Sequence, residues 1–130
     1  MTRTHENVGD LLQSKQREPD GDITPMKAAR SVIETVKVFE GRWKLEILFC
    51  LFGGKVRRFS DLERAIDGVS QKMLAQQLRQ LEHEGMVRRI VYAEVPPRVE
   101  YALTDWGQAL CPALDALLKW KALRADASAE

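Results

Sequence analysis

Cysteine and histidine are scarce in this sequence of 130 residues, which contains two of each. Cys50 and Cys111 lie far apart and outside any CxxC pair, and His5 and His83 are equally isolated. Disulfide frameworks and zinc knuckles need closely spaced cysteine or histidine residues, so neither is predicted. A metal site would have to be built mainly from carboxylates, and we expect no metal and no cofactor.

Long apolar segments are also missing, since the longest unbroken apolar run covers only residues 47–52. A helix that spans a bilayer needs about 20 apolar residues, and the first ten residues lack the apolar core of a signal peptide. The composition, 45% hydrophobic and 30% charged, is that of an ordinary globular domain. We therefore expect one cytoplasmic domain without a membrane partner.

Neither sign of charge is in excess overall, because 20 basic residues are balanced by 19 acidic ones. The distribution is uneven, however. Residues 41–98 hold 11 basic and 7 acidic residues, a net charge of +4, which leaves −3 for the remainder. A basic middle between acidic ends is compatible with a surface that binds nucleic acid.

The first third of the chain divides into a polar arm and two helices. Residues 1–25 are polar and hold two of the five prolines, so we expect a flexible arm, with a short helix near 8–15. Apolar residues then recur at every third or fourth position from 26 to 39, which predicts an amphipathic helix. Residues 43–52 are apolar almost all round, which predicts a helix buried on most sides and ended by the two following glycines.

Two capping signals follow in the middle of the chain. The S-x-x-E sequence that starts at Ser60 is a capping box and predicts a short helix over 60–66. Gly68 ends that helix, and Ser70 caps a longer helix over 70–84. Two helices joined by so short a turn are typical of a helix-turn-helix motif.

The last third predicts a hairpin and a helix. Residues 86–92 and 99–103 have the composition of strands, and EVPPR at 94–98 forms the turn between them. Thr104 and Asp105 cap a helix that runs to about Leu123 and is kinked at Pro112, followed by a frayed tail over 125–130. The predicted fold is mainly α (α+β): a winged helix-turn-helix domain over 26–124 with additional N- and C-terminal dimerisation helices.

The second helix of the motif has two unlike faces. Leu74, Leu78 and Leu81 share the face that we expect to point to the core, whereas the opposite face is rich in amides and bases. Glutamine pairs with adenine, and arginine or lysine pairs with guanine, at the edge of the major groove. A solvated face without a ligand is the alternative. The predicted recognition residues are Ser70, Gln71, Lys72, Gln76, Arg79 and Gln80.

Further basic residues flank this helix. Those just before the short helix precede amides that can hold a phosphate, with a charged loop as the alternative. Pro96, Pro97 and Arg98 form the predicted wing contact. Arg98 either touches the DNA backbone or minor groove, or it pairs with Glu94 or Glu100 across the hairpin. The predicted DNA-backbone residues are Lys55, Arg57, Arg58 and Ser60.

The last helix carries an apolar stripe wider than one core contact needs, and the helix at 26–39 offers a second apolar surface. A monomer would leave much of this surface exposed. A single protomer that contacts ~4–5 base pairs discriminates weakly among genomic sites, whereas a two-fold dimer contacts two half-sites one helical turn apart. We therefore expect a homodimer, with an interface formed by Val32, Ile33, Val36, Leu110, Leu114, Leu117, Leu118 and Trp120.

Six short motifs occur in a fixed order: GRW at 41–43, RRFSDL at 57–62, GVSQKML at 68–74, QLRQL at 77–81, VPPRVEY at 95–101 and LTDWG at 103–107. Together they resemble the HxlR-type winged helix-turn-helix transcriptional regulators, over residues 31–120. The resemblance implies a bacterial or archaeal dimeric regulator in which helices from both chain ends form the dimer. It places the recognition helix at 70–84 and the wing at 92–101.

One departure from that family concerns cysteine. Its thiol-sensing members resemble one another in a Cys-Pro pair about 13 residues before the tryptophan that corresponds to Trp43. Arg30 and Ser31 occupy that place here, which argues against peroxide or quinone sensing. We expect Cys50 to behave as a small apolar residue of the buried helix. We expect Cys111 to be a packing residue, with a disulfide to the same residue of a partner as the alternative.

The sequence thus predicts a DNA-binding transcriptional regulator whose partners are double-stranded DNA and a second copy of the chain. The alternative is a winged-helix module for protein–protein contact, against which the basic helix face argues. An enzyme is not expected, because the sequence shows no nucleophile–base arrangement, phosphate loop or carboxylate cluster. A small-molecule effector stays open as a further partner. Four aromatic residues could line a pocket for such an effector: Phe39, Trp43, Phe49 and Trp106. The alternative, which we favour, is that they are plain core residues.

Overall fold

The computed structural model describes residues 24–129, with side chains up to residue 125. Residues up to 38 and residues from 39 onward form two compact units, which are described separately. In the first, helix α2 (Pro25–Lys37) starts at the N-cap Thr24, whose side chain accepts a hydrogen bond from an amide of the first turn. The expected arm and its short helix lie outside the described residues, apart from Thr24, which caps α2, and Pro25, which opens it.

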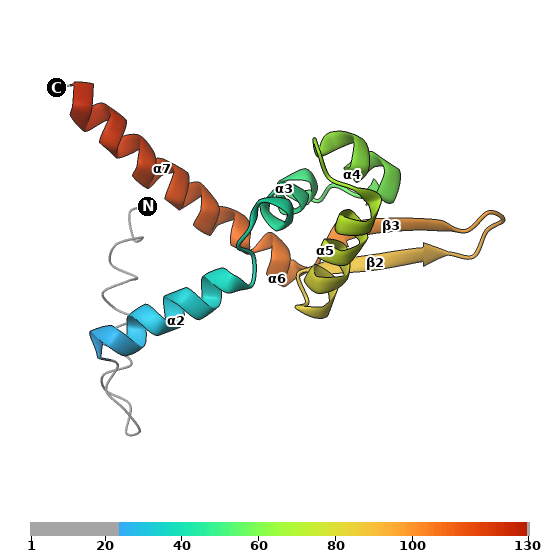
Figure 1. Ribbon diagram of the computed structural model, residues 1–130, viewed down its shortest axis with the longest axis horizontal. Coiled ribbons are helices and arrows are strands. Elements are labelled where there is room, and N and C mark those ends of the chain that lie inside the picture. The colour runs from blue at the N-terminus through green and yellow to red at the C-terminus, as the bar shows by residue number, and fades with distance from the viewer. Residues whose placement is uncertain (1–23, 130) are drawn as a thin grey trace. The chain divides into compact units, whose positions relative to one another are not determined.

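The second unit contains the helix-turn-helix motif, the hairpin and the last helices, in the predicted order (Figure 1). It is mainly helical, with a small antiparallel sheet. Its elements are α3 (Arg42–Leu51), β1 (Arg57–Arg58), α4 (Phe59–Ala65), α5 (Gln71–His83), β2 (Val87–Tyr92), β3 (Arg98–Leu103), α6 (Asp105–Gln108) and α7 (Leu110–Ala129).

The sheet has three strands in the order β1-β3-β2, because the short strand β1 joins the hairpin. The sequence analysis assigned no strand there, since two residues are too few to show the alternation that marks a strand. Arg57 pairs with Tyr101 and Arg58 pairs with Glu100. Successive side chains of a strand point to opposite faces, so Arg57 and Arg58 project to different sides of the sheet.

The core of this unit lies where α3, α4, α5 and the sheet meet. The three leucines predicted to form the core face of α5, Leu74, Leu78 and Leu81, are at most 1% exposed, which confirms that prediction. Helix α3 is less buried than expected, because Phe49 stays 49% exposed, although its ring packs edge to face against that of Phe52. Trp106 is 57% exposed, so these two aromatic residues belong to the surface rather than to plain core.

The two helices of the motif are capped differently. Ser70 caps α5 as predicted, since its Oγ accepts a hydrogen bond from an amide of the first turn at 3.1 Å. Helix α4 starts earlier than predicted, with Arg58 as its N-cap and Ser60 inside the first turn. The Arg58 amide donates to Asp61 Oδ2 at 3.0 Å. Asp61 therefore has the capping role that the sequence analysis gave to Glu63.

The single C-terminal helix expected from the sequence is two helices. The chain breaks at Ala109, between α6 and α7, rather than kinking at Pro112. Pro112 lies in the first turn of α7, where its missing amide removes no helical hydrogen bond. Helix α7 continues to Ala129, so residues 125–129 are helical where we expected a frayed tail. Neither α7 nor any other helix within residues 24–129 is long and apolar enough to cross a membrane.

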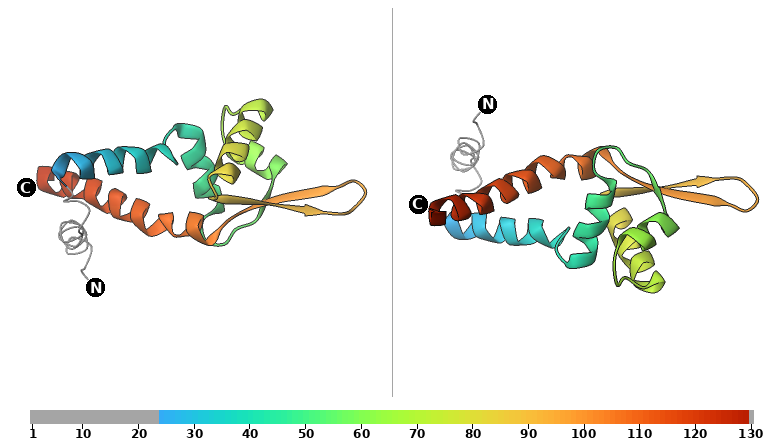
Figure 2. Two further views of the ribbon diagram at one scale, coloured as in Figure 1. Left: turned by 90° about the horizontal axis from the view of Figure 1, so that it is seen from below. Right: turned by 90° about the horizontal axis from the view of Figure 1, so that it is seen from above.

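The hairpin is an extended wing. Its register, from Val87 opposite Leu103 to Tyr92 opposite Arg98, leaves a tip of residues 93–97. Val95, Pro96 and Pro97 are exposed there. Figure 2 shows the hairpin projecting beyond α4 and α5, while α7 leaves the unit on the other side.

Candidate nucleic-acid interface

Helix α5 presents a polar face to solvent opposite its buried leucines. No acidic residue occurs in the helix before Glu82, close to its C-terminal end. Within residues 24–129, neither Lys72 nor Arg79 makes a salt bridge. This face, called the recognition face below, therefore has cations that form no ion pair with any of the residues that the structure describes. Its exposed residues are Ser70, Gln71, Lys72, Gln76, Arg79, Gln80 and His83.

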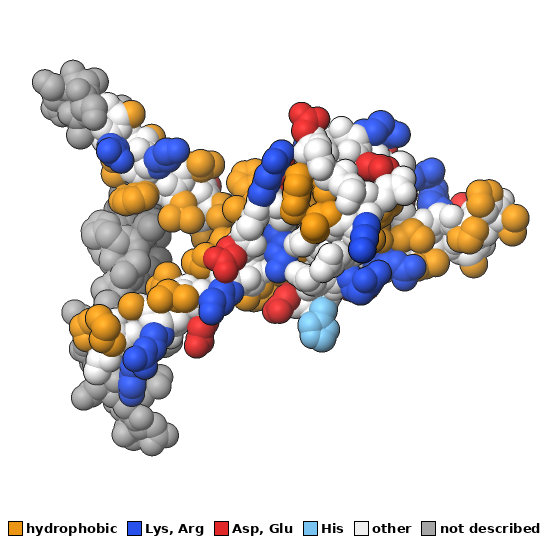
Figure 3. Space-filling view, in the orientation of Figure 1, with side chains coloured by type: hydrophobic (Ala, Val, Ile, Leu, Met, Phe, Trp, Pro, Cys, Tyr) orange, Lys and Arg blue, Asp and Glu red, His pale blue; other side chains and the backbone are white. Residues whose placement is uncertain are grey.

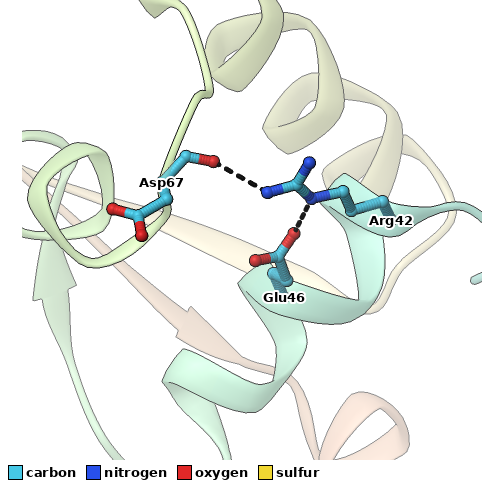
Figure 4. Close-up of polar contacts among 3 residues, drawn as sticks. All are labelled: Arg42, Glu46 and Asp67. Atoms are coloured by element: carbon cyan, nitrogen blue, oxygen red, sulfur yellow. Dashed lines mark hydrogen bonds and ion pairs between the residues drawn. The ribbon is translucent and has the colours of Figure 1, made fainter.

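The turn between α4 and α5 is tied to helix α3 by Arg42 (Figure 4). Its guanidinium donates to the Asp67 carbonyl oxygen at 3.0 Å and to Glu46 Oε2 at 2.8 Å. It also lies over the Trp43 ring, 4.4 Å from the centroid. The same indole comes within 3.7 Å of the place where a Cβ on Gly68 would lie, and Gly68 has a φ of +82°. Arg42 and Trp43 thus fix the turn that orients α5, a role that the sequence analysis did not assign.

Residues predicted separately come together in a hollow between the starts of α4 and α5 and the wing. Arg58, the N-cap of α4, and Ser60 in its first turn line the hollow on one side, and Gln71 lines it from the first turn of α5. The wing contributes Pro96, Pro97 and Arg98, together with neighbouring residues of the tip. The hollow also contains two carboxylates, those of Glu63 and Glu94. This hollow, called the wing hollow below, therefore brings together residues predicted to contact the DNA backbone and the bases with the residues of the predicted wing contact.

Two of the predicted backbone residues are not among those that line the wing hollow. Arg57 lies on the opposite face of the sheet from Arg58, because both are paired in β1. Lys55 is exposed in the loop before that strand. Strand pairing therefore separates the side chains of Arg57 and Arg58, and the role of all four residues as DNA-backbone contacts stays a prediction.

Lys44 is a basic residue beside the recognition face that the sequence analysis missed. It lies on α3 and lines a second hollow together with Gln76, Arg79, Gln80 and His83 of α5. The signal in the sequence was a lysine in a mostly apolar helix, and the structure leaves its side chain half-buried. Lys44 adds a cation on the side of α5 away from the wing hollow.

Arg98 in the wing is paired within the chain. Its Nη2 lies 3.4 Å from Glu94 Oε1, its Nε lies 3.9 Å from Glu100 Oε2, and its guanidinium lies over the Tyr92 ring. A hydrogen bond to Glu100, and then the charge of that carboxylate, raise the pKa of the Tyr92 phenol. Of the two alternatives for Arg98, pairing across the hairpin is the arrangement found in the isolated chain.

Exposed apolar side chains mark the expected self-association surfaces. Figure 3 shows hydrophobic side chains along α7 and at the tip of the wing. On α7, Leu117, Leu118 and Trp120 are all more than half exposed, and Leu110 is partly exposed. On α2, the unit described separately, Val32 and Ile33 are exposed and Val36 is partly exposed. Leu114 differs, since only 7% of it is accessible, and it has little surface for a partner.

Both cysteines are free thiols that are partly buried. Burial, the largest influence, raises the pKa of the Cys50 thiol. The reactive form of cysteine is the thiolate, so Cys50 is held in its less reactive form at neutral pH. No group of three or more potential metal ligands occurs among residues 24–129.

A buried three-helix core, an exposed recognition helix and a projecting hairpin together define the winged helix-turn-helix class. A family model described as "HxlR-like helix-turn-helix" matches residues 38–128. The chain belongs to the HxlR-like helix-turn-helix family.

Similar proteins agree with this assignment. The HTH-type transcriptional regulator YtcD of Bacillus subtilis (strain 168) is 49% identical over 92 residues, 71% of this chain and 72% of that protein. A crystal structure of a transcriptional regulator from Enterococcus faecalis V583, described there as of the MarR family, has a TM-score of 0.74 at 37% identity. It covers 84% of this chain and 98% of the other. The redox regulator HypR in its reduced form has a TM-score of 0.67 at 37% identity, over 75% and 95% of the two chains. The chain is a transcriptional regulator of the helix-turn-helix type rather than an enzyme.

Proposed function

We propose that this regulator binds double-stranded DNA sequence-specifically as a homodimer. Helix α5 of each protomer lies in the major groove, and the β2–β3 hairpin rests on the backbone or in the adjacent minor groove. The recognition face carries this proposal: it is exposed, it is free of acids along most of its length, and its cations are unpaired within residues 24–129. A helix that only supported the fold would have no need of such a face.

The bases around α5 supply the phosphate contacts that set its position in the groove. Arg58 and Ser60 border the recognition helix at its start, and Lys44 borders it on the other side. Contacts to phosphate fix register and orientation, whereas contacts to base edges carry sequence information. Gln76 and Arg79, in the middle of the exposed face, are the side chains that we assign to base edges.

The homodimer accounts for the exposed apolar surface and for specificity. Two recognition helices related by a two-fold axis reach half-sites about 34–36 Å apart, one helical turn of DNA. We assign the interface to the apolar residues of α7 and α2 other than Leu114. The target is chromosomal DNA, which in a prokaryotic cell places the dimer in the cytoplasm.

A footprint on the DNA upstream of the protein's own gene tests the proposal, because many regulators control their own synthesis. Protection of two half-sites about 10 base pairs apart is the expected result. Binding should also weaken by orders of magnitude between about 50 and 200 mM salt if several phosphates are contacted. Binding to no duplex, or binding that is insensitive to salt, would favour the protein–protein module instead.

Arg79→Ala should lower the affinity for the specific site without lowering the affinity for other DNA sequences. We expect a loss of about 1–3 kcal/mol on the footprinted site, concentrated at one base position, and little loss on unrelated duplexes. Arg58→Ala is the matched control, because removing a phosphate-binding group should weaken binding to every duplex by a similar factor. Competition titrations with single-base variants of the site measure both effects. Equal losses on all sequences for Arg79→Ala would remove it from the base-contacting set.

A further inference from the structure

Arg98 is enclosed by the wing's own side chains at the point where the wing faces the proposed DNA site. Its guanidinium lies 4.0 Å from the centroid of the Tyr92 ring, on the neighbouring strand. Glu94 lies 3.4 Å from one terminal nitrogen, and Glu100 lies 3.9 Å from Nε. Only 32% of the arginine side chain is accessible. A cation well placed for phosphate is therefore already engaged.

This engagement is loose. Strong arginine–carboxylate hydrogen bonds are about 2.7–2.9 Å long, whereas the contact to Glu94 is 3.4 Å. Glu94 is about half exposed, and exposed ion pairs contribute only ~0–1 kcal/mol. Moreover, Arg98 Nε is buried without a hydrogen-bond partner among the described residues, and an unsatisfied buried donor is destabilising. Replacing Glu94 by another anion therefore costs little free energy.

The two carboxylates differ in what holds them. Glu100 sits within the paired strand β3 and is the more buried of the two. Glu94 lies in the exposed tip before the prolines, and within residues 24–129 its side chain has no ion-pair partner besides Arg98. Glu94 is thus the partner that can leave while Tyr92 and Glu100 keep the arginine in place.

A DNA phosphate can reach Arg98 through the wing hollow. Glu94 and Arg98 line it together with Arg58 and Ser60, which we assign to the DNA backbone. A phosphate that approaches Arg58 and Ser60 therefore enters the same space as the Arg98–Glu94 pair. Glu63 also lines this hollow, but it makes no salt bridge with Arg98.

We propose that Glu94 is a built-in counter-ion of Arg98. Glu94 pairs with Arg98 in the DNA-free protein, and a backbone phosphate takes its place when a duplex binds. This inference rests on the proposed function. Because the exchange costs the same for every sequence, it weakens non-specific binding and leaves base contacts of α5 to decide where the dimer stays. Tyr92 and Glu100 act as the platform on which the arginine remains during the exchange.

Anisotropy titrations of a labelled mixed-sequence duplex of about three helical turns (~30 base pairs) test the exchange. At about 150 mM salt, where longer-range charge effects are screened, E94Q should tighten binding roughly two- to fivefold. E63Q is the matched control, since it removes the same charge from the same hollow without freeing Arg98. It should tighten binding by less than about half as much.

Variants of Arg98 distinguish the exchange from simple repulsion between the Glu94 carboxylate and the DNA phosphates. R98Q should weaken binding, and E94Q added to R98Q should tighten it no more than E63Q does. R98M, which keeps the stem on Tyr92, replaces R98Q if thermal melts show that R98Q does not fold. E94Q binding equal to wild type, or an equal gain from E94Q with and without Arg98, would overturn the inference alone. A wild-type protein that binds no duplex would overturn the proposed function and this inference with it.

Discussion

Gly107→Ala is expected to lower the free energy of unfolding by about 2–3 kcal/mol, although it adds a single methyl group. Gly107 is buried, and a Cβ there would lie against the Met86 carbonyl oxygen and 3.0 Å from its carbonyl carbon. The obstacle is backbone, which cannot rotate aside as a side chain can. Chemical denaturation followed by circular dichroism measures the loss, and the melting temperature should fall by roughly 10 °C.

The Met86 carbonyl cannot retreat, because Thr104 holds it. The Thr104 amide donates to the Met86 oxygen at 3.0 Å, while Thr104 Oγ1 donates to the Gly85 oxygen at 2.6 Å. The same hydroxyl accepts a hydrogen bond from the Gly107 amide at 3.0 Å. The start of α6 is thus bound to the turn after α5, and any shift disturbs the recognition helix.

Ala109→Ser is the control for Gly107→Ala. It also adds one heavy atom to the end of α6, but on an exposed residue, so its effect should stay within about 0.5 kcal/mol. If the two variants unfold at the same denaturant concentration, the close approach of α6 to Met86 is not a constraint on the fold.

Local patterns were enough to predict most of the helices and the wing. The leucine spacing of α5, its serine cap and the strand composition of β3 each depend on residues a few positions apart. The helix face, the cap and the strand are all confirmed, although the residues of β3 do not alternate between buried and exposed. The recognition face follows from the same spacing, because a helix with one buried face must expose the other. Its role in binding DNA stays a prediction.

Features that depend on distant partners were missed. Strand β1 exists only because Arg57 and Arg58 pair with residues more than 40 positions later, and this pairing separates two arginines that look equivalent in the sequence. Arg42 holds the Asp67 carbonyl, 25 positions away. The need for glycine at position 107 comes from Met86. No local periodicity carries such information.

The alternatives left open for Arg98 show the same limit. The sequence places Glu94 and Glu100 near enough to pair and the prolines near enough to suggest a DNA contact. Only the fold shows that the paired arginine lines the same hollow as Arg58 and Ser60. The two alternatives then become two states of one residue.

Trp120→Glu is expected to turn a dimer into a monomer of 14.8 kDa. Trp120 is 70% exposed within the chain, so the variant should fold, but a carboxylate placed in an apolar interface loses its hydration without gaining a partner. Because two linked recognition helices bind far more tightly than one, affinity for the operator should fall by at least about a hundredfold. Sedimentation at micromolar concentration and anisotropy titrations measure the two losses.

Lys119→Gln is the matched control for Trp120→Glu. It lowers the net charge by the same single unit at the neighbouring position, whose side chain is exposed and paired with Asp115 of the same helix. This variant should remain dimeric and bind DNA within about threefold of wild type, since exposed ion pairs and single surface charges contribute little. A Trp120→Glu protein that stays dimeric would place the interface elsewhere. A monomeric one that still binds the operator as tightly as wild type would show that the paired recognition helices are not needed for specificity.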